Sequence, residues 1–438
     1  MIDPREQTVA PCVRFLTFTA VVLTAAGLVP AATPHQPLQW QPEIVQTTTI
    51  HGRTVIRYEH DCLGKWGYIE PRRDYFYVIL PEKPPKAPPL LVLLHSAGGS
   101  GEKELEGNVQ RVVDAGPGFV GLVPNAAPPK QPDWWWGSQL IKEHPEKYRS
   151  ALTPVENRVL ATVDWVARQQ NVDRNRIYLH GISMGGSGAL GLGMYHGNVF
   201  AALCAKVPAG ADHVMHRMGF PRPPADNAST ETQEKYLRWV SHAGLPDAPP
   251  LVTFSSQLDN WSKGQESFMR ALADGRHAVV FAWGPWGHRN VYERYHAAVY
   301  EFPWLEIRKN EAYPVFTHAS TDDRYPGHKS TATDQQGQVN GFFRWKTLED
   351  TPERFAIELR LVRANELSRP TTTPGESVAD VTLRRLQRFT VDGSREYAWE
   401  LRRQDKVVAS GTVRPDAAAL LTVPRLTITD RPAELVLR

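Results

Sequence analysis

Residues 176–189 constrain the fold of this chain more than any other stretch. A short apolar run at 177–179 leads into Gly-x-Ser-x-Gly at 181–185, and small residues continue to 189. A strand that turns abruptly into a helix strains the backbone of the turn residue, so its neighbours must lack bulk. The pattern predicts a strand, a sharp turn and a helix, with the Ser183 hydroxyl above a sheet edge. An ordinary turn is the alternative interpretation, because the sequence Gly-x-Ser-x-Gly also occurs by chance.

Apolar runs on both sides of this stretch predict an α/β fold. Continuous runs of this kind are typical of strands buried on both faces of a parallel sheet. They lie at 90–94, 119–123, 200–207, 251–255 and 278–282. Helical segments separate them, and the best marked begins with Thr153 as N-cap and Glu156 as its capping-box partner. Residues 71–305 are therefore expected to form a mostly parallel sheet covered by helices on both faces.

The pattern changes beyond residue 305. Short alternating runs without helical punctuation predict an all-β sandwich over residues 336–438, after a linker at 306–335. Residues 33–70 are expected to be an N-terminal extension. Residues 208–249 are rich in Pro, Met, His and Trp and are longer than an ordinary connection. We expect them to be an insertion in the α/β part.

The N-terminal residues have the pattern of a targeting signal. An apolar run at 15–29 follows Arg14 and precedes Ala31, which predicts a signal peptide over residues 1–32. The protein is then exported, to the periplasm or outside the cell, with no stable membrane span after cleavage. Asp3 and Glu6 dilute the positive charge of this segment, so an uncleaved anchor and a misassigned start codon are alternatives.

The charge of the chain limits its possible binding partners, and its cysteine content limits its possible disulfides. The net charge is +3 with both signs scattered along the chain, which argues against nucleic acid as a partner. Signal cleavage removes Cys12 and leaves Cys62 and Cys204. In an exported protein these two could pair as a disulfide, and two separate buried thiols are the alternative.

Ser183 needs a base and an acid to become a nucleophile. Reactive groups gather at the carboxyl ends of strands in an open parallel sheet, so the partners should follow strands downstream of Ser183. Asp259 follows the run at 251–255, and His288 follows the run at 278–282. The order Ser, Asp, His fits a nucleophile elbow. Two rival acids are less well placed, since Asp247 precedes its strand and Asp274 lies in a turn.

An oxyanion needs backbone N–H donors. One is expected from Met184, directly after the nucleophile. The second is expected from the glycine-rich loop after the strand at 90–94, with Ala97 as first choice and Ser96 as second. An ordinary flexible turn is the alternative interpretation of this loop.

These motifs carry a family resemblance. Residues 94–99, residues 172–186, Asp259 and Gly287-His288 resemble secreted esterases of the α/β-hydrolase fold. These esterases are related to polyhydroxybutyrate depolymerases and to feruloyl or acetylxylan esterases. The resemblance spans roughly residues 70–305 and departs at Ser96, where the family usually has Gly. It implies a catalytic domain over residues 71–305 that hydrolyses carboxylic esters through an acyl-enzyme, without metal or organic cofactor. The ester would be a small molecule or borne on a polymer.

The resemblance also bears on two neighbouring segments. Three adjacent tryptophans, Trp134, Trp135 and Trp136, could stack on a sugar or an aromatic acyl group, or could pack their loop onto the core. The insertion at 208–249 lies where α/β-hydrolases commonly carry a lid. Its histidines and methionines lack a carboxylate partner in register, so we expect no metal there. They are His213, Met215, His216 and Met218.

Two other functions remain open at this stage. A serine peptidase of the prolyl-oligopeptidase type shares the fold and the order of the triad, but it usually carries a large propeller, for which residues 33–70 leave no room. A non-catalytic hydrolase-fold protein could bind a glycan or a partner, and a full Ser, Asp, His set argues against it. The C-terminal sandwich could contact carbohydrate in either case.

Overall fold

The computed structural model describes most of the chain. The described residues are 40–68, 71–126, 135, 137, 143–148, 151–208, 228–240, 246–288, 296–329 and 336–438. Residues 42–438 form one compact unit. Several predictions fall outside the described residues: the signal peptide at 1–32, Trp134, Trp136, and the four His and Met residues of the 208–249 insertion.

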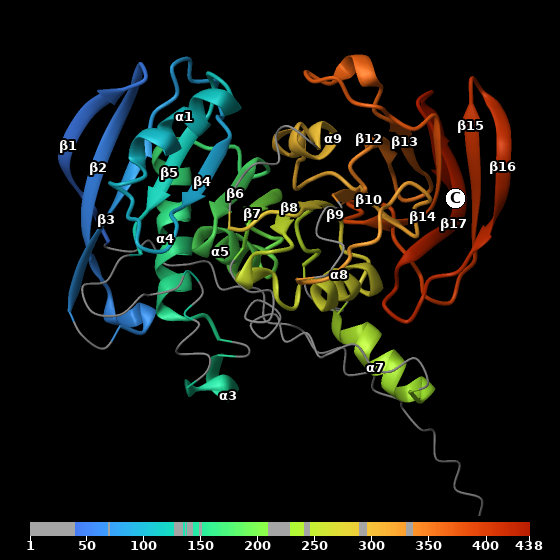
Figure 1. The fold of residues 1–438 in the computed structure, drawn as a ribbon, viewed down its shortest axis with the longest axis horizontal. Coiled ribbons are helices and arrows are strands. Elements are labelled where there is room, and N and C mark those ends of the chain that lie inside the picture. The colour runs from blue at the N-terminus through green and yellow to red at the C-terminus, as the bar shows by residue number, and fades with distance from the viewer. Residues whose placement is uncertain are drawn as a thin grey trace, which may run out of the picture. The chain divides into compact units, whose positions relative to one another are not determined.

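A central sheet of ten described strands organises the α/β part (Figure 1). Its strand order is β1-β2-β3-β5-β4-β6-β7-β8-β9-β11. The strands are β1 (Glu43–Ile50), β2 (Arg53–Cys62), β3 (Arg72–Ile79), β4 (Leu90–Leu94), β5 (Val120–Pro124), β6 (Ile177–Ile182), β7 (Ala202–Lys206), β8 (Leu251–Ser256), β9 (Val279–Gly284) and β11 (Gly337–Val339). Strands β5, β4, β6, β7, β8 and β9 pair in parallel, whereas β1 to β3 and β11 pair antiparallel at the two sides.

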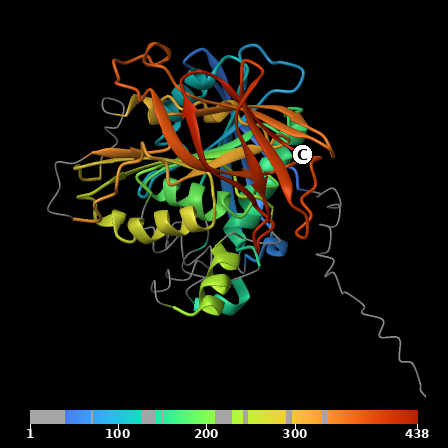
Figure 2. The same ribbon diagram turned by 90° about the vertical axis from the view of Figure 1, so that its right-hand side faces the viewer.

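Helices cover both faces of this sheet, as Figures 1 and 2 show. One face carries α1 (Leu105–Ala115) and α9 (Ala297–Tyr300), and the other carries α4 (Pro154–Gln169), α5 (Met184–Gly193) and α8 (Gln265–Asp274). The predicted capping box begins α4, because the Glu156 carboxylate accepts the Thr153 N–H at 2.8 Å while the Thr153 hydroxyl accepts the Glu156 N–H. The predicted mostly parallel sheet, covered by helices on both faces, is confirmed.

Shorter elements complete this part of the chain. The helices α3 (Pro145–Tyr148) and α7 (Thr230–Val240) belong to connections, and α7 lies within the predicted insertion. Three-residue 3-10 turns are found at η1 (Gly64–Trp66), η2 (Asn260–Ser262), η4 (Trp304–Glu306) and η5 (Ala364–Glu366). No helix in the described part of the chain has the length and apolar character needed to cross a membrane.

The predicted C-terminal sandwich is also present. A three-stranded sheet has the order β10-β14-β17, and a five-stranded sheet has the order β12-β13-β18-β15-β16. The strands are β10 (Tyr313–Thr317), β12 (Phe343–Asp350), β13 (Phe355–Leu361), β14 (Glu376–Arg384), β15 (Tyr397–Arg403), β16 (Lys406–Val413), β17 (Leu421–Thr429) and β18 (Ala433–Leu437). Apolar side chains from both sheets share one core, which includes Phe355, Leu359, Val381 and Val423.

The expected boundaries differ from the structure in three places. The N-terminal extension at 33–70 contributes β1 and β2 to the central sheet. The linker at 306–335 contains β10, which is a strand of the sandwich. Residues 337–339, expected in the sandwich, form β11 and pair with β9 instead. The sequence pattern of each segment is local, whereas its membership of a sheet depends on a partner strand distant in sequence.

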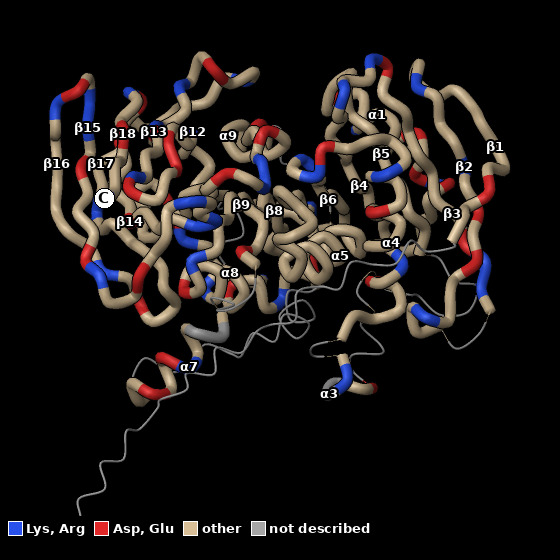
Figure 3. Tube along the Cα trace, turned by 180° about the vertical axis from the view of Figure 1, so that it is seen from behind, with Lys and Arg blue, Asp and Glu red and all other residues tan. Residues whose placement is uncertain are grey.

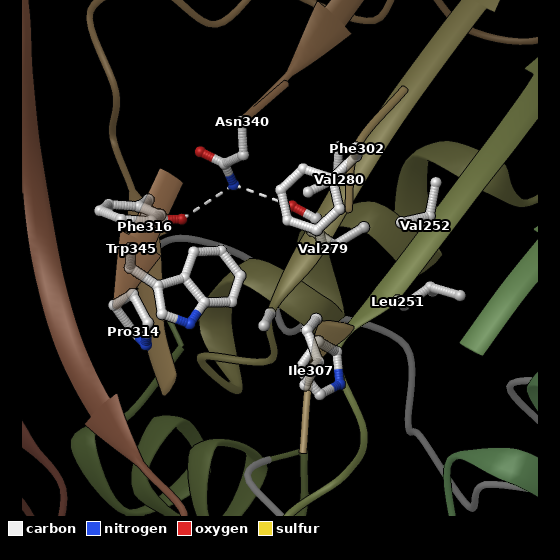
Figure 4. Close-up of a pocket in the computed structure, with 12 residues that line it drawn as sticks. Leu251, Val252, Val279, Val280, Phe302, Ile307, Pro314, Phe316, Asn340 and Trp345 are labelled. Carbon is white, nitrogen blue, oxygen red and sulfur yellow. Dashed lines mark hydrogen bonds between the residues drawn. The ribbon is translucent and has the colours of Figure 1, made fainter. Parts of the chain in front are cut away.

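The sandwich is joined to the α/β part by buried polar contacts. The side-chain amide of Asn340 donates to the carbonyls of Val279 at 3.0 Å and Phe316 at 3.1 Å (Figure 4). The nearly buried Arg384 guanidinium donates to the Asp247 carboxylate at 2.7 Å. The cavity in Figure 4 holds only about 10 Å³ and contains none of the predicted site residues. The side chains that line this cavity therefore pack closely against each other.

Positions of Lys and Arg and positions of Asp and Glu are interspersed along the described trace (Figure 3). This distribution agrees with the scattered charges of the sequence.

Candidate active site

Ser183 lies in the strained turn that the sequence predicts. Its φ is 57° and its ψ is −119°, between the end of β6 and the start of α5. A Cβ on Gly181 would lie 2.0 Å from the carbonyl oxygen of Gly185, and one on Gly185 would lie 2.1 Å from that of Leu94. Because these obstacles are backbone atoms, both positions require glycine. The Ser183 N–H donates to the Lys206 carbonyl at 2.9 Å and fixes the turn against β7.

The structure brings Ser183, His288 and Asp259 into one hydrogen-bonded chain. Nε2 of His288 lies 2.9 Å from the Ser183 Oγ, and Nδ1 of His288 lies 2.6 Å from the Asp259 Oδ2. Since an ionised carboxylate only accepts, Nδ1 carries the proton and Nε2 is left to accept from the serine. The hydrogen bond that His288 donates to Asp259 raises the pKa of His288, and partial burial opposes this rise.

Asp259 is held by its own turn as well as by His288. Its second carboxylate oxygen, Oδ1, accepts the Trp261 N–H at 2.9 Å, and the side chain is nearly buried. The two rival acids lie elsewhere. Asp247 pairs with Arg384 at the seam, and Asp274 accepts from the Tyr236 hydroxyl at 2.9 Å. Asp259 is the acid that contacts His288.

The loops that carry the acid and the histidine are hydrogen-bonded to each other. The Gln257 N–H donates to the Gly284 carbonyl, and the Leu258 N–H donates to the Trp286 carbonyl, each at 3.0 Å. These bonds continue the parallel pairing of β8 and β9 beyond the ends of the strands. Asp259 and His288 are therefore placed by two adjacent strand ends, as the sequence predicts.

The loop after β4 is locked by the side chains of Ser96 and Glu104. The Ser96 N–H donates to Glu104 Oε1 at 2.9 Å, and the Ser96 hydroxyl donates to the Ile182 carbonyl at 3.2 Å. The N–H of Ser96 is thus engaged by Glu104, which argues against our second choice for an oxyanion donor. Ala97, the next residue, is exposed and stays our prediction. A Cβ on Gly99 would lie 2.3 Å from Glu104 Oε1, so a side chain there would displace the carboxylate that holds the Ser96 N–H.

The other expected donor, Met184, is the first residue of α5. The first N–H groups of a helix have no acceptor within that helix, and the positive end of the helix dipole lies there. The backbone N–H of Met184 is thus at a position suited to a developing negative charge. Its role stays a prediction.

A buried polar network holds the far end of the loop after β4. The Asn125 side chain accepts the Gly101 N–H at 3.2 Å and donates to Asp74 at 2.9 Å. Arg158 pairs with Asp74 at 3.2 Å and donates to the Asn125 carbonyl at 2.6 Å. All three side chains are nearly inaccessible to solvent. Because each buried charge has an opposite partner, the network can be rigid.

His95 is a structural histidine at the base of the same loop. Its Nε2 accepts the Ala126 N–H at 3.0 Å, so the proton lies on Nδ1, which donates to the Ser96 carbonyl at 2.9 Å. Burial lowers the pKa of His95, which favours the neutral ring. Both ring nitrogens are occupied, so His95 is not a base for Ser183.

The structure contradicts the prediction that Trp135 binds substrate. The side chain is wholly buried, and its Nε1–H donates to the His95 carbonyl at 3.0 Å. Its ring packs against α5 so closely that a Cβ on Gly188 would lie 2.5 Å from the Trp135 Cβ. Trp135 therefore packs its loop onto the nucleophile helix, which is the alternative that the sequence left open.

The structure also contradicts the proposed disulfide. Cys62 and Cys204 are both buried and do not pair with each other. Cys62 ends β2 and Cys204 lies in β7, five strand positions apart in the sheet. At about 4.8 Å per strand that is roughly 24 Å, far beyond the reach of a disulfide. Burial raises the pKa of the Cys204 thiol to about 11.

Sequence reasoning missed two residues that contact this site. Glu104 precedes α1, where an acidic residue is usually interpreted as a helix-start signal. His328 contacts the Asp259 turn from within the expected linker, and nothing in its neighbourhood marks it. Among the residues described, no cluster of His, Cys, Asp and Glu could hold a metal ion.

Comparison with known proteins gives structural likenesses only. No family model matches the sequence, and a search of curated proteins finds no match. An S-formylglutathione hydrolase from Agrobacterium tumefaciens is similar at 16% identity and a TM-score of 0.41, over 56% of this chain and 92% of that one. An acetyl xylan esterase from Aspergillus awamori is similar at 14% identity and a TM-score of 0.38, over 53% of this chain and 93% of that one. Because these scores and identities are low, we base the function on the side chains of this chain.

Proposed function

We propose that this chain is an exported serine esterase that hydrolyses carboxylic esters through an acyl-enzyme. The observation that carries the proposal is the continuous hydrogen-bonded chain from Ser183 Oγ through His288 to Asp259. It stands on a strained turn, at the carboxyl ends of adjacent parallel strands. Export rests on the apolar run at 15–29.

Each group has a role in the proposed reaction. His288 Nε2 takes the proton of Ser183 as its Oγ attacks the ester carbonyl, and Asp259 stabilises the imidazolium that forms. The N–H groups of Met184 and Ala97 would hold the oxyanion. Collapse of the tetrahedral intermediate expels the alcohol, which leaves with the proton from His288. Water then attacks the acyl-enzyme with His288 as base, and the acid product leaves while Ser183 regains its proton.

The loop after β8, which carries Asp259, favours a substrate with an apolar or ring-shaped group. Leu258 and Trp261 flank Asp259 and are 44% and 39% exposed. Large exposed apolar side chains beside a reactive group are typical of substrate contacts. Ester substituents of a polysaccharide, or the repeat of a polyester, would meet this surface.

The test is hydrolysis by the purified mature chain. The panel contains p-nitrophenyl acetate and butyrate, methyl ferulate, acetylated xylan and a proline-containing peptide amide. Ser183→Ala should lower kcat by up to about a millionfold, because loss of the nucleophile removes the covalent route. Ser394→Ala, which removes an exposed hydroxyl from the sandwich, is the matched control and should behave like wild type.

Equal ester hydrolysis by Ser183→Ala and wild type would contradict the proposal. Cleavage of the peptide amide alone would assign a peptidase instead. A folded protein that is silent on every substrate would favour the binding function.

A further inference from the structure

The segment that follows β10, residues 318–329, contacts the loop after β8 that carries Asp259. The Lys329 N–H donates to the Gln257 carbonyl at 3.0 Å, and Nδ1 of His328 lies 2.9 Å from the Ser262 Oγ. Gln257 and Ser262 stand on either side of Asp259. The turn that presents the acid is thus contacted from a part of the chain more than 60 residues away in sequence, since His328 and Ser262 are separated by 66 positions.

The direction of the His328 contact follows from the proton count. The Ser262 hydroxyl donates its single proton to the Asp259 carbonyl at 2.8 Å. Its contact with His328 must then be one in which Nδ1–H donates and Ser262 Oγ accepts. The backbone N–H of Ser262 donates to the same Asp259 carbonyl at 3.0 Å, and Ser262 is almost inaccessible to solvent. His328 therefore fixes the hydroxyl that closes the turn around Asp259.

The same segment also holds the strand that leads to the histidine. β11 pairs with β9, with Gly337 opposite Trp283, and β9 ends four residues before His288. The Tyr325 ring packs on Trp283, with their ring centres 5.4 Å apart. The Asp323 carboxylate accepts the Gln338 N–H at 2.9 Å and ties the segment to β11. One segment thus contacts the supports of both Asp259 and His288.

We propose that His328 is a positioning residue: through Ser262 it holds the turn that aims the Asp259 carboxylate at His288. The inference rests on the proposed function. On this proposal, the segment that contains His328 helps to position the reacting groups. His328 itself touches neither substrate nor Ser183.

Four variants test this role: His328→Ala, His328→Asn, Ser262→Ala and the double variant Ser262→Ala/His328→Ala. Loss of one hydrogen bond in the turn should lower kcat about three- to tenfold with KM unchanged. Asparagine places an amide N–H near the position of Nδ1, so His328→Asn should keep most of the wild-type rate. The double variant should be no slower than the slower single variant, because both changes remove the same contact.

A second measurement separates positioning from mere stability. The acid limb of the kcat/KM profile, and the NMR titration of His288, should shift to lower pH in His328→Ala, since a displaced Asp259 supports the imidazolium less. His318→Ala is the matched control. That histidine lies on the same segment but is exposed and pairs with Asp380 at 3.0 Å on the sandwich, so its loss should move neither rate nor profile.

The outcomes are distinct. If His328→Ala lowers the melting temperature but leaves the pH profile and kcat unchanged, the contact is structural and the inference is overturned. Additive losses in the double variant would also overturn it. Absence of wild-type turnover would instead refute the proposed function, and the NMR titration of His288 would still report on the contact.

Discussion

The two halves of the candidate site are supported in different ways. The nucleophile half comprises the Ser183 turn and the loop after β4, and its closest contacts are between backbones, as where Gly185 lies against the Leu94 carbonyl. The acid–base half comprises the loops after β8 and β9. It is held by hydrogen bonds that include a contact from His328, and an extra Cβ on Gly287 would meet nothing within 4 Å. The first half adds close contacts between backbones to its hydrogen bonds, whereas the loop around Gly287 in the second half leaves room for an added side chain.

This difference predicts how each half should fail. Close packing transmits a displacement to its neighbours, so a small added volume in the nucleophile half should shift reacting atoms. A hydrogen-bonded turn tolerates added volume at its surface but responds to the loss of a charge or a donor. Volume changes and polar changes therefore separate the two halves.

Loss of the acid charge should have the largest effect. Asp259→Asn removes the carboxylate that holds the His288 tautomer, and kcat should fall by about 10⁴-fold. The carboxylate raises the pKa of His288 above its ordinary 6.5, so wild-type kcat/KM should increase with pH through that raised pKa as the base forms. In the variant this limb should move to lower pH. A pH–rate profile checks both points, and an unmoved limb would contradict the assigned contact.

A single added methyl group should lower the rate strongly in the nucleophile half and hardly at all in the acid–base half. Gly185→Ala places a Cβ 2.1 Å from a backbone carbonyl oxygen, and relief requires a backbone shift. A misplacement of about 1 Å costs roughly 100-fold in rate, so at least that loss is expected, with a lower melting temperature. Gly287→Ala, in the acid–base half, is the matched control and should be nearly silent. Equal losses in both variants would contradict the steric account.

Ser96 offers a smaller, polar change within the nucleophile half. Ser96→Gly introduces the residue usual in the resembling esterases and removes the hydroxyl that donates to the Ile182 carbonyl. The backbone N–H bond to Glu104 is kept, so we expect only a three- to tenfold loss in kcat. Steady-state kinetics checks it. A rate above wild type would mean that the hydroxyl restrains the loop rather than positions it.

Of the four substitutions predicted in this section, Trp135→Phe should have the smallest effect on activity. It keeps most of the ring that packs on Gly188 and removes the Nε1–H bond to the His95 carbonyl. The buried carbonyl loses a partner, which is worth about 1 kcal/mol of stability, and activity should fall no more than about threefold. Thermal unfolding and kinetics measure the two effects. A change in substrate preference would instead restore Trp135 as a binding residue.

The sequence predicted much of the fold because the deciding forces act between neighbours in the chain. The strained turn at Ser183 follows from glycines two residues away on either side, and the α4 cap from Thr153 and Glu156. Strands β4, β5, β8 and β9 are buried, and their continuously apolar sequences already predict this burial. The acid and histidine could be chosen because parallel strands bring their carboxyl ends to one edge.

Tertiary structure decided what depends on distant partners. Strand order sets Cys62 and Cys204 apart, packing on Gly188 buries Trp135, and the Glu104 carboxylate accepts the Ser96 N–H. The segment expected as a linker pairs with the sandwich and contacts the Asp259 turn. None of these contacts leaves a local pattern, because each joins residues whose proximity exists only after the sheets have formed. The sequence by itself determined the turn that raises Ser183, and the assembled sheets decided what surrounds it.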